Sequence, residues 1–215
     1  MQIAIPLYER FTALDAIGPY EVLSRLPGAK VTFIASQAGP VRTDNDMLAL
    51  HADAALADMP SPDILVVPGG FGTRALLGDE EMLSWIRAAH ETSTWTTSVC
   101  TGSLLLAAAG LLDGLEAATH WAAAGVLDQL GAKYVEQRVV QQGKIVTSAG
   151  VAAGIDMALT LAAKIAGDDI AQTIQLYIEY DPQPPFDSGA PSKAPESVMA
   201  LARAIGDTEQ VPASG

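Results

Sequence analysis

The chain has 215 residues, of which 49% are hydrophobic and 17% charged, and its formal net charge is −13. This composition is typical of a globular protein and excludes an intrinsically disordered chain. The negative charge disfavours nucleic acids and anionic membranes as partners, and no apolar run approaches the roughly 20 residues that cross a bilayer. The N-terminal segment lacks the basic start of a signal peptide, and a single cysteine suits a reducing compartment. We therefore expect a cytoplasmic protein.

Apolar runs that favour strands alternate with patterns that favour helices from residue 2 to about residue 178. The expected strands are Ile3 to Tyr8, Val31 to Ala35, Ile64 to Val67, Trp95 to Val99 and Ile145 to Ser148, with weaker ones at Leu48 to His51 and Tyr134 to Val140. The expected helices are Leu14 to Leu26, Glu80 to His90, Ser103 to Ala109, Ala123 to Leu130 and Gly154 to Ile165. This alternation predicts an α/β fold with a mostly parallel sheet and helices on both faces.

The C-terminal part of the chain has a different composition. Residues 181–191 are rich in Pro and Gly, which predicts an irregular segment that is either a lid or interface arm or a plain surface connector. A last helix is expected from Pro195 to Ile205. We find no linker between two domains, so we expect one domain over residues 1–205 and a flexible tail at 206–215.

The single cysteine, Cys100, stands where a predicted strand turns directly into a predicted helix. A thiol at such an elbow lies past the end of the sheet, near the helix N-terminus and its unpaired N–H groups. Both features favour the thiolate, which is the nucleophilic form, so we expect the pKa of Cys100 to lie below its ordinary value. The alternative is a small buried side chain without a chemical role.

A second predicted strand ends in paired glycines, Gly69 and Gly70, which follow Pro68. Glycines allow backbone N–H groups to approach a reacting atom closely. The N–H groups of Gly70 and Thr101 are therefore candidates for an oxyanion-type hole. A phosphate site is disfavoured, because no Gly-Lys-Ser/Thr sequence follows the glycines.

Two ionisable side chains are candidate partners of the thiol. Asp15 opens the first helix, where it is either a helix N-cap or, if that helix lies beside the elbow, a general acid or base. His120 follows Cys100 by 20 residues and is either the base of a Cys-His pair or a structural histidine. The histidines are too scattered to predict a metal site.

Five segments together resemble the ThiJ/PfpI superfamily, whose members have a flavodoxin-like fold. The segments are Leu14 to Pro19, Pro68 to Gly70, Ser98 to Ser103, Ala118 to Trp121 and Ala149 to Asp156. They span nearly the whole chain. The stretch from Gln175 to Tyr180, with the prolines after it, looks most like the isocyanide hydratases of this superfamily.

The resemblance implies cofactor-free hydration of an isocyanide to an N-substituted formamide by a homodimeric hydro-lyase. It implies that Cys100 is the nucleophile and Asp15 the proton carrier, with Thr101 as a further catalytic residue. Gly69, Gly70 and His120 would then bind substrate. Thr101 stands where peptidase-like members carry a histidine, so protease activity is not expected.

Two alternatives stay open at this stage. One is another thiol-dependent reaction, such as hydration of methylglyoxal. The other is a sensor domain that binds a small ligand without turnover, like the ligand-binding halves of related transcription regulators. We would expect such a sensor to carry a helix-turn-helix module of about a hundred residues after the domain, and the sequence ends at Gly215.

Overall fold

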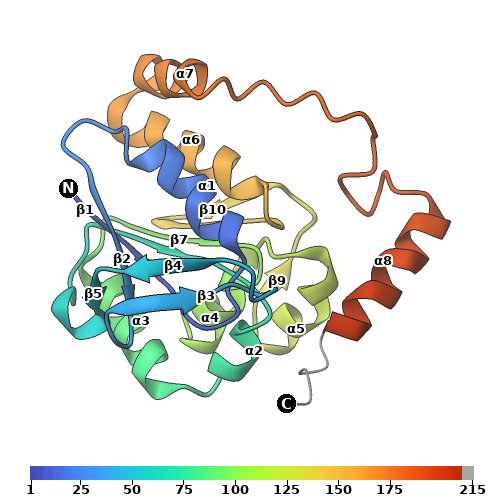
Figure 1. Cartoon of the computed structure of the whole chain (residues 1–215), viewed down its shortest axis with the longest axis horizontal. Helices are drawn as coiled ribbons and strands as arrows, with labels where there is room; N and C mark the ends of the chain where they lie inside the picture. Colours follow the sequence, from blue (N-terminus) through green and yellow to red (C-terminus); the bar gives the residue numbers. More distant parts are fainter. Residues whose placement is uncertain (210–215) are drawn as a thin grey trace. The chain divides into compact units, whose positions relative to one another are not determined.

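The computed structural model describes residues 1–209 and divides into two compact units, Met1–Glu179 and Tyr180–Gly215. The first unit contains a seven-stranded sheet in which every strand pair is parallel except the one at an edge (Figure 1). In spatial order the strands are β10 (Val139–Gln142), β11 (Ile145–Ser148), β7 (Trp95–Val99), β6 (Ile64–Val67), β1 (Gln2–Pro6), β2 (Lys30–Ala35) and β5 (Ala54–Ala55). The α/β fold predicted from the sequence is confirmed.

Helices cover both faces of this sheet, as Figure 1 shows, with α1 and α6 packed together on one face and α3 and α4 on the other. The helices of the first unit are α1 (Ala13–Leu23), α2 (Thr73–Leu76), α3 (Glu80–Thr92), α4 (Gly102–Ala108), α5 (Ala124–Gln129), α6 (Ala153–Ala166) and α7 (Asp168–Tyr177), with short 3-10 turns η1 (Leu56–Asp58) and η2 (Trp121–Ala123). Two small sheets complete it: β3 (Gly39–Arg42) with β4 (Ala49–Ala52), and β8 (Glu116–Ala117) with β9 (Lys133–Tyr134). No helix within residues 1–209 is long and apolar enough to cross a membrane.

The second unit contains an irregular segment followed by α8 (Glu196–Glu209), as the Pro- and Gly-rich composition predicts. Residues 206–209 belong to α8, so the tail predicted from residue 206 onward begins inside a helix. The rest of that predicted tail, residues 210–215, lies outside the described part of the chain.

Parallel pairing brings four strand ends to one edge of the sheet. Ile3 of β1 pairs with Ile64 of β6, Val67 of β6 with Ser98 of β7, and Val99 of β7 with Ser148 of β11. The loops that follow these strands therefore emerge together, which is where open α/β sheets place their sites. All four residues of β6 are buried, as expected of a central strand covered on both faces.

Close packing at two glycines allows the elements around this edge to meet. A Cβ built on Gly102 would lie 2.1 Å from the carbonyl oxygen of Val67, so only glycine lets the start of α4 approach the end of β6. A Cβ on Gly154 would lie 3.2 Å from Pro19 and 3.0 Å from Val99. The start of α6 therefore packs tightly between α1 and β7.

Candidate active site

Cys100 forms a strained elbow between β7 and α4. Its φ of 56° lies in the left-handed region, which costs a non-glycine residue about 1–2 kcal/mol. Hydrogen bonds hold the residue there: its N–H donates to the carbonyls of Ser148 and Ala149, at 3.2 and 3.1 Å. Its own carbonyl accepts bonds from the hydroxyls of Ser103 and Thr119, both at 3.1 Å. The elbow predicted from the sequence is confirmed, and it leaves the thiol buried, with the residue 5% exposed.

Asp15 is buried beside this thiol. It is the third residue of α1, whose N-cap is Thr12, so the N-cap alternative for Asp15 is wrong. One carboxyl oxygen, Oδ2, accepts the N–H of Gly69 at 2.9 Å, and the carboxyl group also forms a hydrogen bond with the thiol of Cys100. Burial raises the pKa of Asp15 to about 7, with a smaller contribution from the charge of Asp44, against the opposing effect of the two hydrogen bonds. Asp15 therefore changes protonation state near neutral pH.

The pKa of the Cys100 thiol is raised, not lowered, and this corrects the expectation from the sequence. Burial is the main cause, followed by the negative charge of Asp15. The N–H groups of Thr101 and Val151 donate to the sulfur and oppose the shift, as expected for an elbow, but they do not outweigh burial. Two acids in contact lose their protons as a pair. The first proton to leave this pair therefore departs near neutral pH.

Gly70 and Thr101 are bonded to each other at the edge of the site. The N–H of Gly70 donates to the hydroxyl oxygen of Thr101 at 2.9 Å, and the hydroxyl of Thr73 lies 3.3 Å from the same oxygen. The N–H of Thr101 thus donates to the sulfur of Cys100, and its hydroxyl donates to the carbonyl of Gly70. The N–H of Gly70 is occupied in this structure, so an oxyanion-hole role for it requires this bond to be exchanged.

His120 lies near the elbow, yet the ionisable partner of the thiol is Asp15. The imidazole packs on Gly150, where a Cβ would lie 2.5 Å from ring carbon Cδ2. Its Nδ1 accepts the N–H of Ala122 at 3.3 Å and so caps the short turn η2. Burial, together with the charge of Arg74, lowers the pKa of His120. These contacts favour the structural interpretation of this histidine over a Cys-His pair.

Val151 is a site residue that the sequence analysis missed. Its backbone N–H faces the sulfur of Cys100, and its φ is 33°, which is unusual for a β-branched residue. Main-chain donors leave no residue-type signal in a sequence. The only indication was that Val151 lies in the segment Ala149 to Asp156, one of those that resemble the superfamily.

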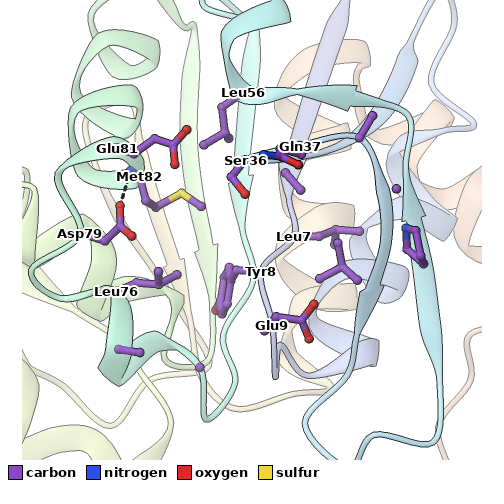
Figure 2. Close-up of a pocket in the computed structure, with 17 residues that line it drawn as sticks. Leu7, Tyr8, Glu9, Ser36, Gln37, Leu56, Leu76, Asp79, Glu81 and Met82 are labelled. Carbon is purple, nitrogen blue, oxygen red and sulfur yellow. Dashed lines mark hydrogen bonds between the residues drawn. The ribbon is translucent and has the colours of Figure 1, made fainter.

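A separate cavity of about 460 Å³ lies between residues 35–41 and the helices α2 and α3 (Figure 2). Leu7, Tyr8, Leu56 and Met82 contribute to its wall, and neither Cys100 nor Asp15 lines it. Tyr8 connects the two regions, because its hydroxyl donates to the carbonyl of Pro68 at 2.6 Å. Among residues 1–209, no group of three or more His, Cys, Asp or Glu side chains is placed to hold a metal ion.

Comparisons with known proteins identify the family of this chain. Residues 1–164 match the model of the DJ-1/PfpI family. Isonitrile hydratase of Pseudomonas putida is 46% identical over 203 residues, covering 94% of this chain and 89% of that protein. The transcriptional regulator CdhR of Pseudomonas aeruginosa is 30% identical over 177 residues, which are 79% of this chain but 51% of the regulator.

A solved structure extends the likeness to the fold. The crystal structure of a ThiJ/PfpI family protein from Pseudomonas syringae superposes with a TM-score of 0.91 at 36% sequence identity. The match covers 97% of this chain and 87% of that protein. The family model spans both the elbow at Cys100 and the helix that carries Asp15. The chain therefore belongs to the DJ-1/PfpI family.

Proposed function

We propose that this protein is a hydro-lyase that adds water to an isocyanide and releases an N-substituted formamide. The observation that carries the proposal is the contact between Cys100 and Asp15, a buried nucleophile and a carboxyl group whose pKa is about 7. A general acid–base group works best when its pKa lies near the working pH. The 46% identity to an isonitrile hydratase supports this substrate class, since isonitrile is another word for isocyanide.

The hydrogen bonds around the site suit an isocyanide better than a carbonyl substrate. Attack on a carbonyl group places negative charge on oxygen, which backbone N–H groups must stabilise. Here the N–H of Gly69 is bonded to Asp15 and that of Gly70 to Thr101. Attack on the terminal carbon of an isocyanide leaves an electron pair on that same carbon, which needs a proton instead. In our proposal the carboxyl group of Asp15 supplies this proton.

In the first half of the reaction, the carboxylate of Asp15 accepts the thiol proton of Cys100 as sulfur bonds to the isocyanide carbon. Asp15 then gives this proton to the carbon, and the product is a neutral thioimidate in which an N=CH group is attached to sulfur. The N–H groups of Thr101 and Val151 stabilise the charge on sulfur while it is exposed. The high thiol pKa is compatible with this order of events, because the proton leaves as the bond forms.

In the second half, Asp15 takes a proton from water as the water oxygen bonds to the thioimidate carbon, and the nitrogen receives that proton. The carbon–sulfur bond of the resulting adduct then breaks. The hydroxyl proton of the adduct returns to sulfur through Asp15, which restores the thiol and leaves a C=O group. The sum is one isocyanide plus one water giving one formamide.

The test is turnover of p-nitrophenyl isocyanide and of methylglyoxal by one preparation of the protein, with Cys100→Ala as the control. We expect formamide from the isocyanide at a rate at least tenfold above that with methylglyoxal, and none from the variant. Faster consumption of methylglyoxal would contradict the proposal. Binding of either compound without turnover would favour a sensor domain. The likeness to the transcriptional regulator CdhR is the reason to keep this alternative.

We also propose that the protein works as a cytoplasmic homodimer. Two adjacent large apolar side chains near the end of α7, Leu176 and Tyr177, are each 78% exposed, which is unusual for a surface that stays in water. A second copy of the chain is the occupant we propose for this surface. The single cysteine, which has no partner for an internal disulfide, supports the reducing compartment.

A further inference from the structure

Tyr8 is buried next to the turn that borders Asp15 and Cys100. It follows β1 by two residues and is 7% exposed. Its ring forms part of the wall of the 460 Å³ cavity, as Figure 2 shows, while its hydroxyl donates to the carbonyl of Pro68 at 2.6 Å. At this distance the bond is a short, well-formed one. The hydroxyl therefore has a fixed partner on the turn that borders the catalytic pair.

The carbonyl of Pro68 and the N–H of Gly69 belong to the same peptide unit. That N–H donates to Oδ2 of Asp15 at 2.9 Å. Because a peptide group is conjugated, a hydrogen bond accepted by its oxygen polarises the unit and makes its N–H a stronger donor. Tyr8, the Pro68–Gly69 peptide and Asp15 thus form one continuous chain of two hydrogen bonds.

The turn that carries this peptide is fixed on its other sides as well. The carbonyl of Gly69 accepts the N–H of Thr12 at 2.8 Å. A Cβ on Gly69 would lie 2.9 Å from Oδ2 of Asp15 and 2.7 Å from the hydroxyl oxygen of Thr101. A side chain at position 69 would clash with both groups, so only glycine lets this turn approach Asp15 and Thr101 so closely.

We propose that Tyr8 is a positioning residue for Asp15, which it holds and tunes through the Pro68–Gly69 peptide. The proposal rests on the proposed function only in that Asp15 is taken as the acid–base group of the reaction. Tyr8 stays protonated in this role, because burial raises its pKa well above the ordinary value and the nearby Asp15 and Cys100 add to the effect. It acts as a hydrogen-bond donor and not as an acid.

The direction of the effect follows from which form of Asp15 the bond favours. The N–H of Gly69 stabilises the carboxylate and so lowers the pKa of Asp15. Burial and the charge of Asp44 raise this pKa, and the thiol of Cys100 lowers it. Removing the Tyr8 hydroxyl weakens the donor and leaves those groups in place. We expect the pKa of Asp15 to rise further above 7, by about 0.3–0.7 unit, from the polarisation of one bond to a charged group.

The experiment uses Tyr8→Phe, which removes one oxygen and keeps the ring. Cys100 is the only cysteine, so its alkylation by iodoacetamide, in which sulfur bonds to carbon and iodide leaves, reports the ionisation of the Asp15–Cys100 pair without a substrate. We expect the midpoint of the rate against pH to move up by about 0.5 unit in Tyr8→Phe. The matched control is Tyr134→Phe, a half-buried tyrosine on β9 whose loss should leave the midpoint unchanged.

Two further measurements separate tuning from a general loss of structure. In an Asp15→Asn background, Tyr8→Phe should give no additional shift, because the group that it tunes is absent. Incorporation of 3-fluorotyrosine at position 8 keeps the hydroxyl and makes it a stronger donor, so the midpoint should fall below that of the wild type. This variant also decides the question if Tyr8→Phe does not fold.

An unchanged midpoint in Tyr8→Phe would overturn the proposal, as would a shift that persists in Asp15→Asn. If isocyanides are turned over, kcat should fall about three- to tenfold in Tyr8→Phe while KM stays within about twofold. If they are not, the alkylation profile still decides the role of Tyr8. Failure of the proposed function and failure of this proposal therefore give different results.

Discussion

Asp15→Asn should stabilise the protein at neutral pH, although it removes the proposed acid–base group. The pKa of Asp15 rises from 3.8 to about 7 on folding, because the carboxylate is buried. Between these values the folded state holds a proton that the unfolded state has lost, so wild-type stability falls as pH rises through this window and is level above it. At 1.36 kcal/mol per unit, the full effect is about 4 kcal/mol.

The packing of the new amide contributes equally at every pH. Comparing the stability of the variant with that of the wild type at two pH values therefore isolates the contribution of the Asp15 proton. At about pH 5 the wild type has lost only about a third to a half of this ~4 kcal/mol of stability, and at about pH 8 it has lost all of it. We therefore expect the free energy of unfolding of Asp15→Asn, relative to the wild type, to become about 2–3 kcal/mol more favourable between these pH values. Urea unfolding followed by circular dichroism measures it.

Asp58→Asn is the matched control, because Asp58 is an exposed aspartate on η1. Its relative stability should change by less than about 0.5 kcal/mol between the same pH values. If Asp15→Asn behaves like this control, the carboxyl group does not titrate near 7 in the folded protein. The account of Asp15 as a neutral-pH proton carrier would then be refuted.

Three other substitutions test the rest of the site. Cys100→Ala should lower isocyanide turnover below about 0.1% of the wild-type rate with the fold intact, as circular dichroism would show, and retention of a few per cent would refute a covalent route. His120→Asn keeps a capping acceptor for Ala122 and should keep at least about a third of kcat, whereas a hundredfold loss would restore the Cys-His pair. Leu176→Glu should convert a dimer of the 22.3 kDa chain to monomers in analytical ultracentrifugation, and an unchanged dimer would place the interface elsewhere.

Much of the fold could be predicted because its signals are local. Each of the five stronger strands predicted from apolar runs overlaps a strand of the main sheet. The helix α7 (Asp168–Tyr177) was missed. Its start signals were present in Gly167, a glycine with φ of 88°, and in the acidic residues Asp168 and Asp169 of the first turn.

The proximity of Asp15 to Cys100 could be anticipated from the sequence, although the local pattern around Asp15 predicts different partners from those in the structure. Thr12-Ala13-Leu14-Asp15 has the spacing of a capping box, with threonine as the N-cap and an acidic residue three positions later. In the structure neither side chain serves that purpose. The hydroxyl of Thr12 donates to Asp44 at 2.8 Å, and Asp15 accepts from Gly69. Hydrogen bonds to distant residues replace the local capping bonds. Asp15 is therefore not used as a cap and can face the thiol.

The direction of the thiol pKa could not be predicted, because it depends on the balance of two opposing effects. A strand-to-helix elbow supplies N–H donors that favour the thiolate, and this effect is visible in the sequence. The depth of burial and the closeness of Asp15 are set by packing between α1 and α6, where a Cβ on Gly18 would lie 3.2 Å from Ile155. Such packing brings a carboxyl group against sulfur and buries both groups. Desolvation then outweighs the donors and keeps the thiol pKa above its ordinary value. In the reaction we propose, Cys100 therefore needs Asp15 to take its proton.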